Sequence, residues 1–118
     1  MANIYTMSGE LDASPGYEVR DEVMAFARLM ETALQANNHK GHWDKCDPCW
    51  LLSKLMEEVG ELAQVVIRMH SPDGNQLILS GDEFINAAVR TGVREAADVG
   101  NLAMMLADVL ARKYVPNK

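Results

Sequence analysis

The stretch WLLSKLMEEVGELAQVV, residues 50–66, decides how this sequence folds. Its apolar residues recur every three or four positions, which is the spacing of one face of an α-helix; they are Leu52, Leu55, Val59, Leu62, Ala63 and Val66. Most of the charged side chains fall on the opposite side of that helix. The stretch therefore predicts a long amphipathic helix that carries three glutamates, Glu57, Glu58 and Glu61.

A second acidic pair, Glu95 and Asp98, lies in another segment of helical periodicity. A run of glutamates is usually a solvated helix face, but Glu95 falls inside the apolar stripe of its helix and Asp98 at the edge. That stripe contains Val99, Leu102 and Leu106. A carboxylate facing a core is costly unless something compensates its charge. This pair therefore points to a bound cation.

Residues three or four apart share one face of a helix, so each acidic group presents a pair of carboxylates. Glu58 and Glu61 point the same way, with Glu57 on the flank. If the two helices cross, Glu58 and Glu61 meet Glu95 and Asp98. Oxygen ligands without His or Cys suit Mg²⁺ or Mn²⁺.

These two motifs, EExxE at residues 57–61 and ExxD at residues 95–98, resemble the signature of the MazG-like, all-α nucleoside triphosphate pyrophosphohydrolases. That superfamily includes MazG, the dimeric dUTPases and the dCTP pyrophosphatases. The resemblance covers about residues 43–112 and extends to the flanking residues. The interval between Glu61 and Glu95 is long for the family, so contacts made by that loop cannot be carried over.

The resemblance implies an all-α bundle with three to four main helices per chain, completed by a homo-dimer or homo-tetramer. It also implies Mg²⁺-dependent hydrolysis of a (d)NTP at the α-phosphorus to a (d)NMP and pyrophosphate, for house-cleaning or nucleotide-pool control. The metal, Mg²⁺ or Mn²⁺, would be held by Glu58, Glu61, Glu95 and Asp98.

The resemblance and the positions of several residues suggest further roles at the site. Glu57 and Glu58 are the catalytic candidates, with Glu57 either the general base or a residue that orients a ligand. Lys54, one turn before Glu58, is a candidate for steadying a phosphate or a carboxylate, or it forms an ordinary i,i+4 ion pair. By the same resemblance, Trp43 and Trp50 lie where related enzymes contact the base and sugar, so either could stack on a base or simply pack. The remaining substrate-binding candidate is Asn101, which could contact the sugar or a metal-bound water. Three cations are further candidates for the phosphates: Arg94, Arg112 and Lys113.

The 118 residues and the net charge of −6 limit the classes of protein. We expect one domain, residues 1–118, with an extended arm at residues 1–13. The negative charge argues against a nucleic-acid partner, whereas a bound cation would still admit a nucleotide. No apolar run has the length of a membrane span, and the first residues lack the features of a signal peptide. We therefore expect a cytoplasmic protein without a membrane partner.

Capping signals place the helix ends. Ser14-Pro15 predicts the start of a first helix that ends near Gln35, and Asp47-Pro48 the start of a second that ends near Met69. A third helix is expected from Ser80 or Asp82 to Lys113, either straight or bent near residues 91–92. The apolar strip at residues 77–79 is too short to predict a strand. The last half of the third helix is apolar over a wide arc, which favours a homo-oligomer.

There are three rival classes of protein. A di-iron carboxylate bundle needs Glu-x-x-His on two helices, and the sequence has none. A non-catalytic helical module for interaction or regulation, binding nucleotide or metal, stays open. So does a small zinc protein, because four zinc-ligand types fall in one short segment: His39, His42, Cys46 and Cys49.

Overall fold

The computed structural model describes residues 18–70 and 82–114, and no β-strand occurs among them. Three α-helices and one short 3-10 helix make up this part of the chain. They are α1 (Asp21–Ala36), η3 (Asn38–Lys40), α2 (Pro48–His70) and α3 (Asp82–Tyr114). The predicted all-α class is confirmed. No described helix is both long and apolar enough to cross a membrane.

Helix α2 begins where its capping signal predicts. The Asp47 carboxylate accepts a hydrogen bond from the backbone N–H of Cys49 over 2.8 Å, and Pro48 occupies the first helical position. A side-chain oxygen at this place satisfies one of the N–H groups that a helix leaves unpaired at its start. The helix ends at His70, one residue beyond the prediction.

Helix α1 begins later than predicted. The signal at Ser14-Pro15 lies outside the described residues, but residues 18–20 are described and are not helical. Arg20 precedes the helix in an extended conformation, without a side-chain cap. The first turn instead carries Asp21 and Glu22, whose charges interact favourably with the exposed N–H groups there. These charges mark the start better than the Ser-Pro pair.

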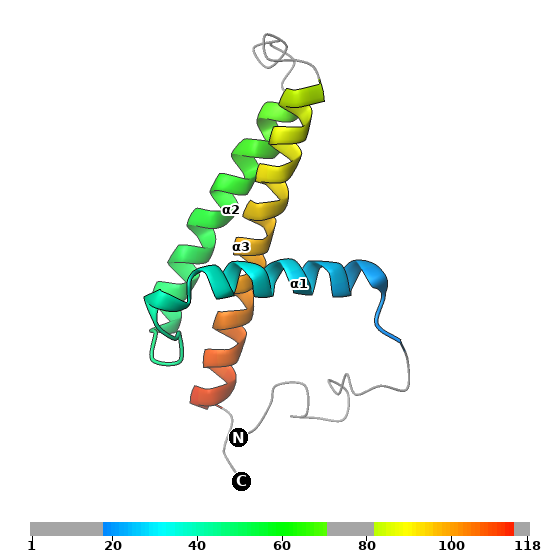
Figure 1. Ribbon diagram of the computed structural model, residues 1–118. Helices are drawn as coiled ribbons and strands as arrows, with labels where there is room; N and C mark the ends of the chain where they lie inside the picture. The colour runs from blue at the N-terminus through cyan, green and yellow to red at the C-terminus, as the bar shows by residue number, and fades with distance from the viewer. Residues whose placement is uncertain (1–17, 71–81, 115–118) are drawn as a thin grey trace.

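Helix α3 continues without interruption through residues 91–92, so its 33 residues form one element. It runs antiparallel to α2, and the two pack along their lengths as a hairpin (Figure 1). The expected N-terminal arm, residues 1–13, and the apolar strip at residues 77–79 lie outside the described residues.

Helix α1 lies across α3 rather than alongside it (Figure 1). Gly100 on α3 allows this close approach. A Cβ atom built on Gly100 would lie 2.9 Å from Cε2 of Phe26 and 3.4 Å from Sδ of Met30, both on α1. Any larger side chain at this point would push the two helices apart. The crossing of α1 over α3 therefore depends on a single glycine.

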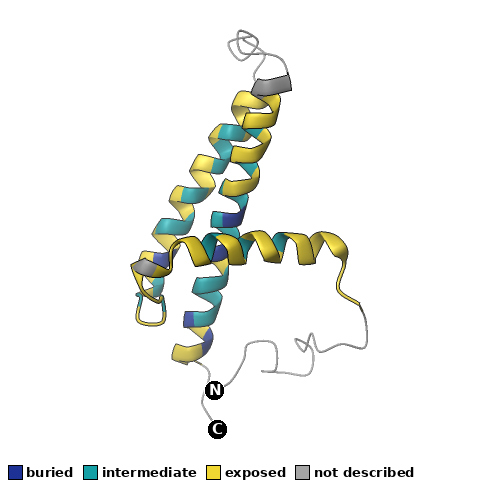
Figure 2. Cartoon of the chain, viewed as in Figure 1, coloured by how far each residue is buried: buried dark blue, intermediate teal, exposed yellow. Residues whose placement is uncertain are grey.

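The single chain buries little apolar surface, as the mostly exposed ribbon in Figure 2 shows. Helix α1 has no buried residue, and α2 has one, Leu51. The buried apolar residues in the described part of the chain are Leu51, Ala97, Val109 and Ala111. Many large apolar side chains remain exposed, among them Met56 at 66% and Ile67 at 65%.

We predict opposite effects for two glycine substitutions. Gly100→Ala should destabilise the chain by about 1–3 kcal/mol, because the added methyl group overpacks the contact with Phe26. Gly60→Ala should stabilise it by about 0.5–1 kcal/mol, because no atom lies within 4 Å of the added Cβ and alanine favours helix. Urea denaturation of both variants measures this. A stabilised Gly100→Ala would contradict the close crossing.

Candidate functional site

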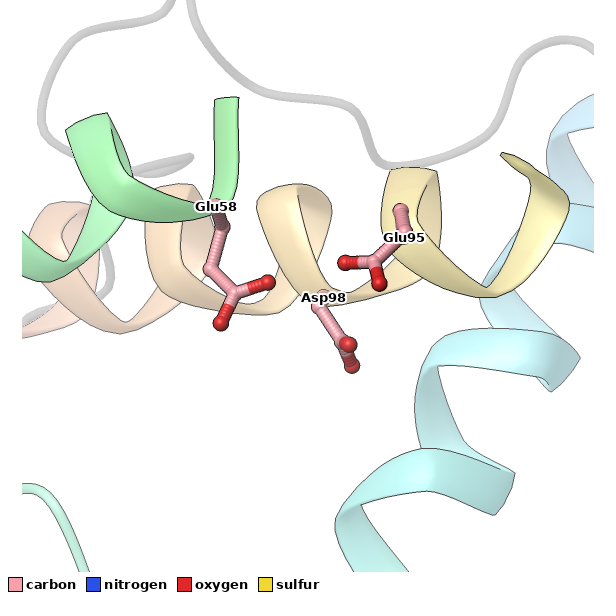
Figure 3. Close-up of side chains that lie close together, drawn as sticks. All are labelled: Glu58, Glu95 and Asp98. Atoms are coloured by element: carbon pink, nitrogen blue, oxygen red, sulfur yellow. The ribbon is translucent and has the colours of Figure 1, made fainter. Parts of the chain in front are cut away.

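Three carboxylates from two helices meet at the centre of the hairpin. Glu58 comes from α2, and Glu95 and Asp98 come from α3 (Figure 3). One ligand oxygen from each lies within 4.8 Å of the others. Among the described residues, these three carboxylates are the group of potential metal ligands that lies within this distance. The helix pairing therefore joins the two sequence motifs.

The cluster holds its protons more tightly than isolated carboxyl groups. Burial, together with neighbouring Glu61, raises the pKa of Glu58 from 4.5 to about 7. Burial also raises the pKa of Glu95, and hydrogen bonding to Glu58 opposes this rise. The charges of Glu61 and Asp98 raise the same pKa further. These shifts follow from removing negative charges from water and placing them side by side.

Two nearby cations partly offset the negative charge of Asp98. Burial and the charge of Glu61 raise its pKa, while Arg94 and Lys40 act in the opposite direction. Lys40 also lines the cleft beside the cluster, so it is a functional candidate that sequence reasoning missed. Lys40 belongs to η3, a short turn whose position relative to α3 has no periodic signal in the sequence.

Two oxygens of the cluster are buried and have no hydrogen-bond partner, namely Oε2 of Glu58 and Oε2 of Glu95. A buried acceptor without a donor costs free energy, and a buried carboxylate costs more. A divalent cation among these oxygens would satisfy them and lower the pKa of each carboxyl group. The all-oxygen donor set thus fits Mg²⁺ or Mn²⁺.

The other two predicted acidic residues lie outside this cluster. Glu61 is exposed but close enough to raise the pKa of all three carboxyl groups. The Glu57 side chain is 62% exposed and pairs with Lys54 over 3.2 Å. Lys54 thus pairs with Glu57, three residues away, and not with Glu58, the partner four residues away that its spacing suggests. The proposed role of Glu57 as general base stays a prediction.

A cleft of about 620 Å³ opens beside the cluster. Glu58 and Asp98 line one part of it, and Asn101 follows along α3. The other predicted substrate-binding residues, Trp43, Trp50 and Lys54, also line this cleft. Segments that are distant in sequence therefore bring Trp43, Trp50, Lys54 and Asn101 to one cavity. The three cations named for the phosphates do not line this cleft; they are Arg94, Arg112 and Lys113.

Trp43 is fixed in the wall of the cleft by an interaction that the sequence does not reveal. Its Nε1 donates a hydrogen bond to Oδ2 of Asp108 over 3.0 Å. Arg112 holds the same oxygen over 2.8 Å, so its guanidinium is engaged there. The imidazole of His42 stacks on the indole with ring centroids 4.1 Å apart. Asp108 thus anchors the loop before α2 to the far part of α3.

Trp50 is more open, with half of its surface exposed. The Lys54 ammonium group lies 5.5 Å from the centre of its ring, within the range of a cation–π contact. Lys54 therefore sits between an aromatic face and the Glu57 carboxylate. This position leaves it at the edge of the cleft, on the same helix as Glu58.

The proposed zinc ligands do not form a cluster among the described residues. His42, Cys46 and Cys49 are not brought together as the three carboxylates are, and the side chain of His39 lies outside the description. Nδ1 of His42 accepts a hydrogen bond from the backbone N–H of Asp44 over 3.1 Å. Both cysteines are free thiols. This arrangement gives no support to zinc.

Comparison with known proteins adds no assignment. The chain matches no protein-family model, no curated protein and no solved structure. Function must therefore be argued from the residues and their geometry.

We predict that the metal-free protein loses stability as the pH rises. Because the pKa of Glu58 is raised to about 7 on folding, the folded chain binds this proton more tightly than the unfolded chain. The resulting stabilisation is complete below about pH 4.5 and is lost as the pH rises through about 7. Thermal denaturation in a chelator, from about pH 5 to about pH 8, should show a falling Tm.

Glu58→Gln is the matched variant for this measurement, since it keeps the side-chain shape and removes the titration. Its Tm should vary less with pH than that of the wild-type chain, and added Mg²⁺ should stabilise the wild type most at high pH. An unchanged pH dependence in Glu58→Gln would show that this carboxyl group is not the cause.

Proposed function

We propose that this chain is a Mg²⁺-dependent nucleoside triphosphate pyrophosphohydrolase, which converts a (d)NTP and water to a (d)NMP and pyrophosphate. The observation that carries the proposal is the cluster of Glu58, Glu95 and Asp98 beside a cleft of about 620 Å³. Such a volume is typical of small-molecule sites. The motif resemblance at residues 57–61 and 95–98 supports the same reaction.

Glu58, Glu95 and Asp98 would hold the metal, with Glu61 next to them. Mg²⁺, or Mn²⁺ in its place, offsets the charge of a triphosphate and activates water for attack on phosphorus when it is bound. The protein supplies two helices that hold the carboxylates in place before the ligand arrives. The raised pKa of Glu58 means that metal and proton compete for this group near pH 7.

The order of residues along α3 matches the order of groups in a nucleotide. The carboxylates of Glu95 and Asp98 come first, the amide of Asn101 follows, and the apolar side chains of Leu102 and Met105 come next. Trp43 lies beyond them, held at the level of Asp108. A triphosphate at the metal would direct its sugar past the amide and its base toward the apolar, aromatic part of the cleft.

Cations of the cleft suit the phosphates. Lys40 and Lys54 line it together with Glu58 and Asp98, so both signs of charge meet the ligand. Lys54 would exchange its partner Glu57 for a phosphate oxygen. Released from this pair, the Glu57 carboxylate could accept the proton of the attacking water, or it could orient a ligand. Both roles remain proposed.

The test is product analysis with Mg²⁺ across canonical and modified NTPs and dNTPs, separating pyrophosphate from orthophosphate. We expect monophosphate and pyrophosphate in equal amounts. Glu95→Gln and Asp98→Asn should lower kcat/KM by at least about a hundredfold, because each removes a metal ligand. Orthophosphate with a nucleoside diphosphate would contradict attack at the α-phosphorus, and no turnover would favour a binding module.

Two further variants calibrate this assay. Glu22→Gln alters an exposed carboxylate in the first turn of α1, remote from the cleft lining, and should leave the rate unchanged. Glu57→Gln should lower the rate while Mg²⁺ affinity is retained if Glu57 is the base. Circular dichroism of each variant confirms that the helices are kept.

We further propose that the chain works as a homo-oligomer, either a dimer or a tetramer. Exposed apolar side chains form a stripe along α2 within an arc of about 100°; they are Leu52, Met56, Val59, Val66 and Ile67. An exposed apolar surface of this kind marks an interaction site. A second copy that covers it would also complete the small core of the single chain.

Disruption of this stripe should dissociate the oligomer. We predict that Met56→Lys, which places a charge at a 66%-exposed apolar position, lowers the mass measured by sedimentation equilibrium to that of one chain. Gln64→Lys, on another side of α2, is the matched control and should leave the mass unchanged. A monomeric wild-type chain would refute the oligomer and leave the proposed chemistry intact.

A further inference from the structure

Asn101 is the buried polar residue of the described core, with only 5% of its surface exposed. Its Nδ2 donates a hydrogen bond to the backbone oxygen of Met30 on α1 over 3.0 Å. Its Oδ1 is also buried and has no partner. One half of this amide is therefore satisfied within the protein, and the other half is not.

The orientation of the amide follows from chemistry. The carbonyl of Met30 can only accept, so the NH₂ group of Asn101 must face it, and the oxygen must face elsewhere. Helix α1 packs closely against Gly100, the residue directly before Asn101, and this contact keeps the Met30 carbonyl in place. A buried acceptor without a donor is costly, so a ligand that brings a donor recovers the loss.

The position of Asn101 restricts what this donor can be. Asn101 lines the cleft one helical turn after Asp98, about 4.5 Å further along the axis of α3. Leu102 and Met105 follow it. The residue thus lies between the carboxylates, where a triphosphate would bind, and the apolar part, where a base would bind. The group of a nucleotide between its phosphates and its base is the sugar.

We propose that Asn101 is a specificity-determining residue whose Oδ1 accepts a hydrogen bond from a sugar hydroxyl of the bound nucleotide. This inference rests on the proposed function, because it takes a nucleotide as the ligand of the cleft. It adds that the site recognises the sugar through a fixed acceptor that α1 holds. A nucleotide without that hydroxyl leaves Oδ1 buried and unpaired.

The test is equilibrium binding, with Ca²⁺ in place of Mg²⁺ to suppress hydrolysis. The probes are ribonucleoside triphosphates of the common bases with their 2′-deoxy and 3′-deoxy counterparts. The wild-type protein should bind one hydroxyl-bearing nucleotide about tenfold to a hundredfold more tightly than the counterpart without that hydroxyl. Asn101→Ala should bind both members of that pair equally and weakly.

Asn37→Ala is the matched control. Asn37 also lines the cleft and also donates from Nδ2 to a carbonyl of α1, that of Ala33 over 2.9 Å, but it is exposed. This variant loses an equivalent bond and should keep the full preference for the hydroxyl. The wild-type comparison needs no variant, so it tests the proposal even if Asn101→Ala does not fold.

Several outcomes would overturn the inference. The same preference in Asn101→Ala would reduce Asn101 to a residue that only holds α1. Equal affinity of the wild-type protein for nucleotides with and without each sugar hydroxyl would contradict the proposed contact. So would an effect of Asn101→Ala that depends on an amino group of the base and not on the sugar. Hydrolysis to pyrophosphate without sugar preference would refute this inference alone, whereas absence of any nucleotide binding would refute the proposed function with it.

Discussion

The pairing of α2 with α3 brings Glu58 against Glu95 and Asp98, and this confinement of like charges governs the rest of the site. Carboxylates that share a partly dry interface cannot all ionise without a counter-charge. A proton or a cation must therefore occupy the interface, and the raised pKa of Glu58 expresses this need. The pairing of the helices therefore costs stability whenever these carboxyl groups ionise without a counter-charge.

Helical periodicity was sufficient to predict α2 and α3 and the helix faces that carry the carboxylates, because both depend on repeats within a helix. It could not show that these two faces meet, which depends on how the helices pair. Glu61 shares the face of Glu58 in sequence, yet its side chain remains exposed outside the cluster. The predicted start of α1 at Ser14-Pro15 was wrong, because residues 18–20 are not helical and the helix begins at Asp21. The bonds of Trp43 to Asp108 and of Asn101 to Met30 connect residues with no common period. They depend on the crossing of α1 and on one loop, which no local pattern specifies.

The chain has long helices but a small interior. Helix α1 reaches α3 through Phe26 and Met30 over Gly100, and its remaining apolar side chains find few partners. Hydrophobic burial is the main favourable term in folding, so a chain with so few buried residues draws limited stability from itself. The polar contact through Asn101 consequently matters more here than it would in a large core.

The anchor between Trp43 and Asp108 has a consequence for the dimensions of the cleft. Asp98 lines one part of the cleft, and Asp108 holds the Trp43 indole that lines another part. Asp98 and Asp108 both belong to the uninterrupted helix α3. Ten residues of α-helix span about 15 Å, and this length hardly changes without loss of backbone hydrogen bonds. Helix α3 thus fixes the distance between the Asp98 carboxylate and the position at which Asp108 holds the indole. Ligands would be sorted by their reach along this scale as well as by their chemistry.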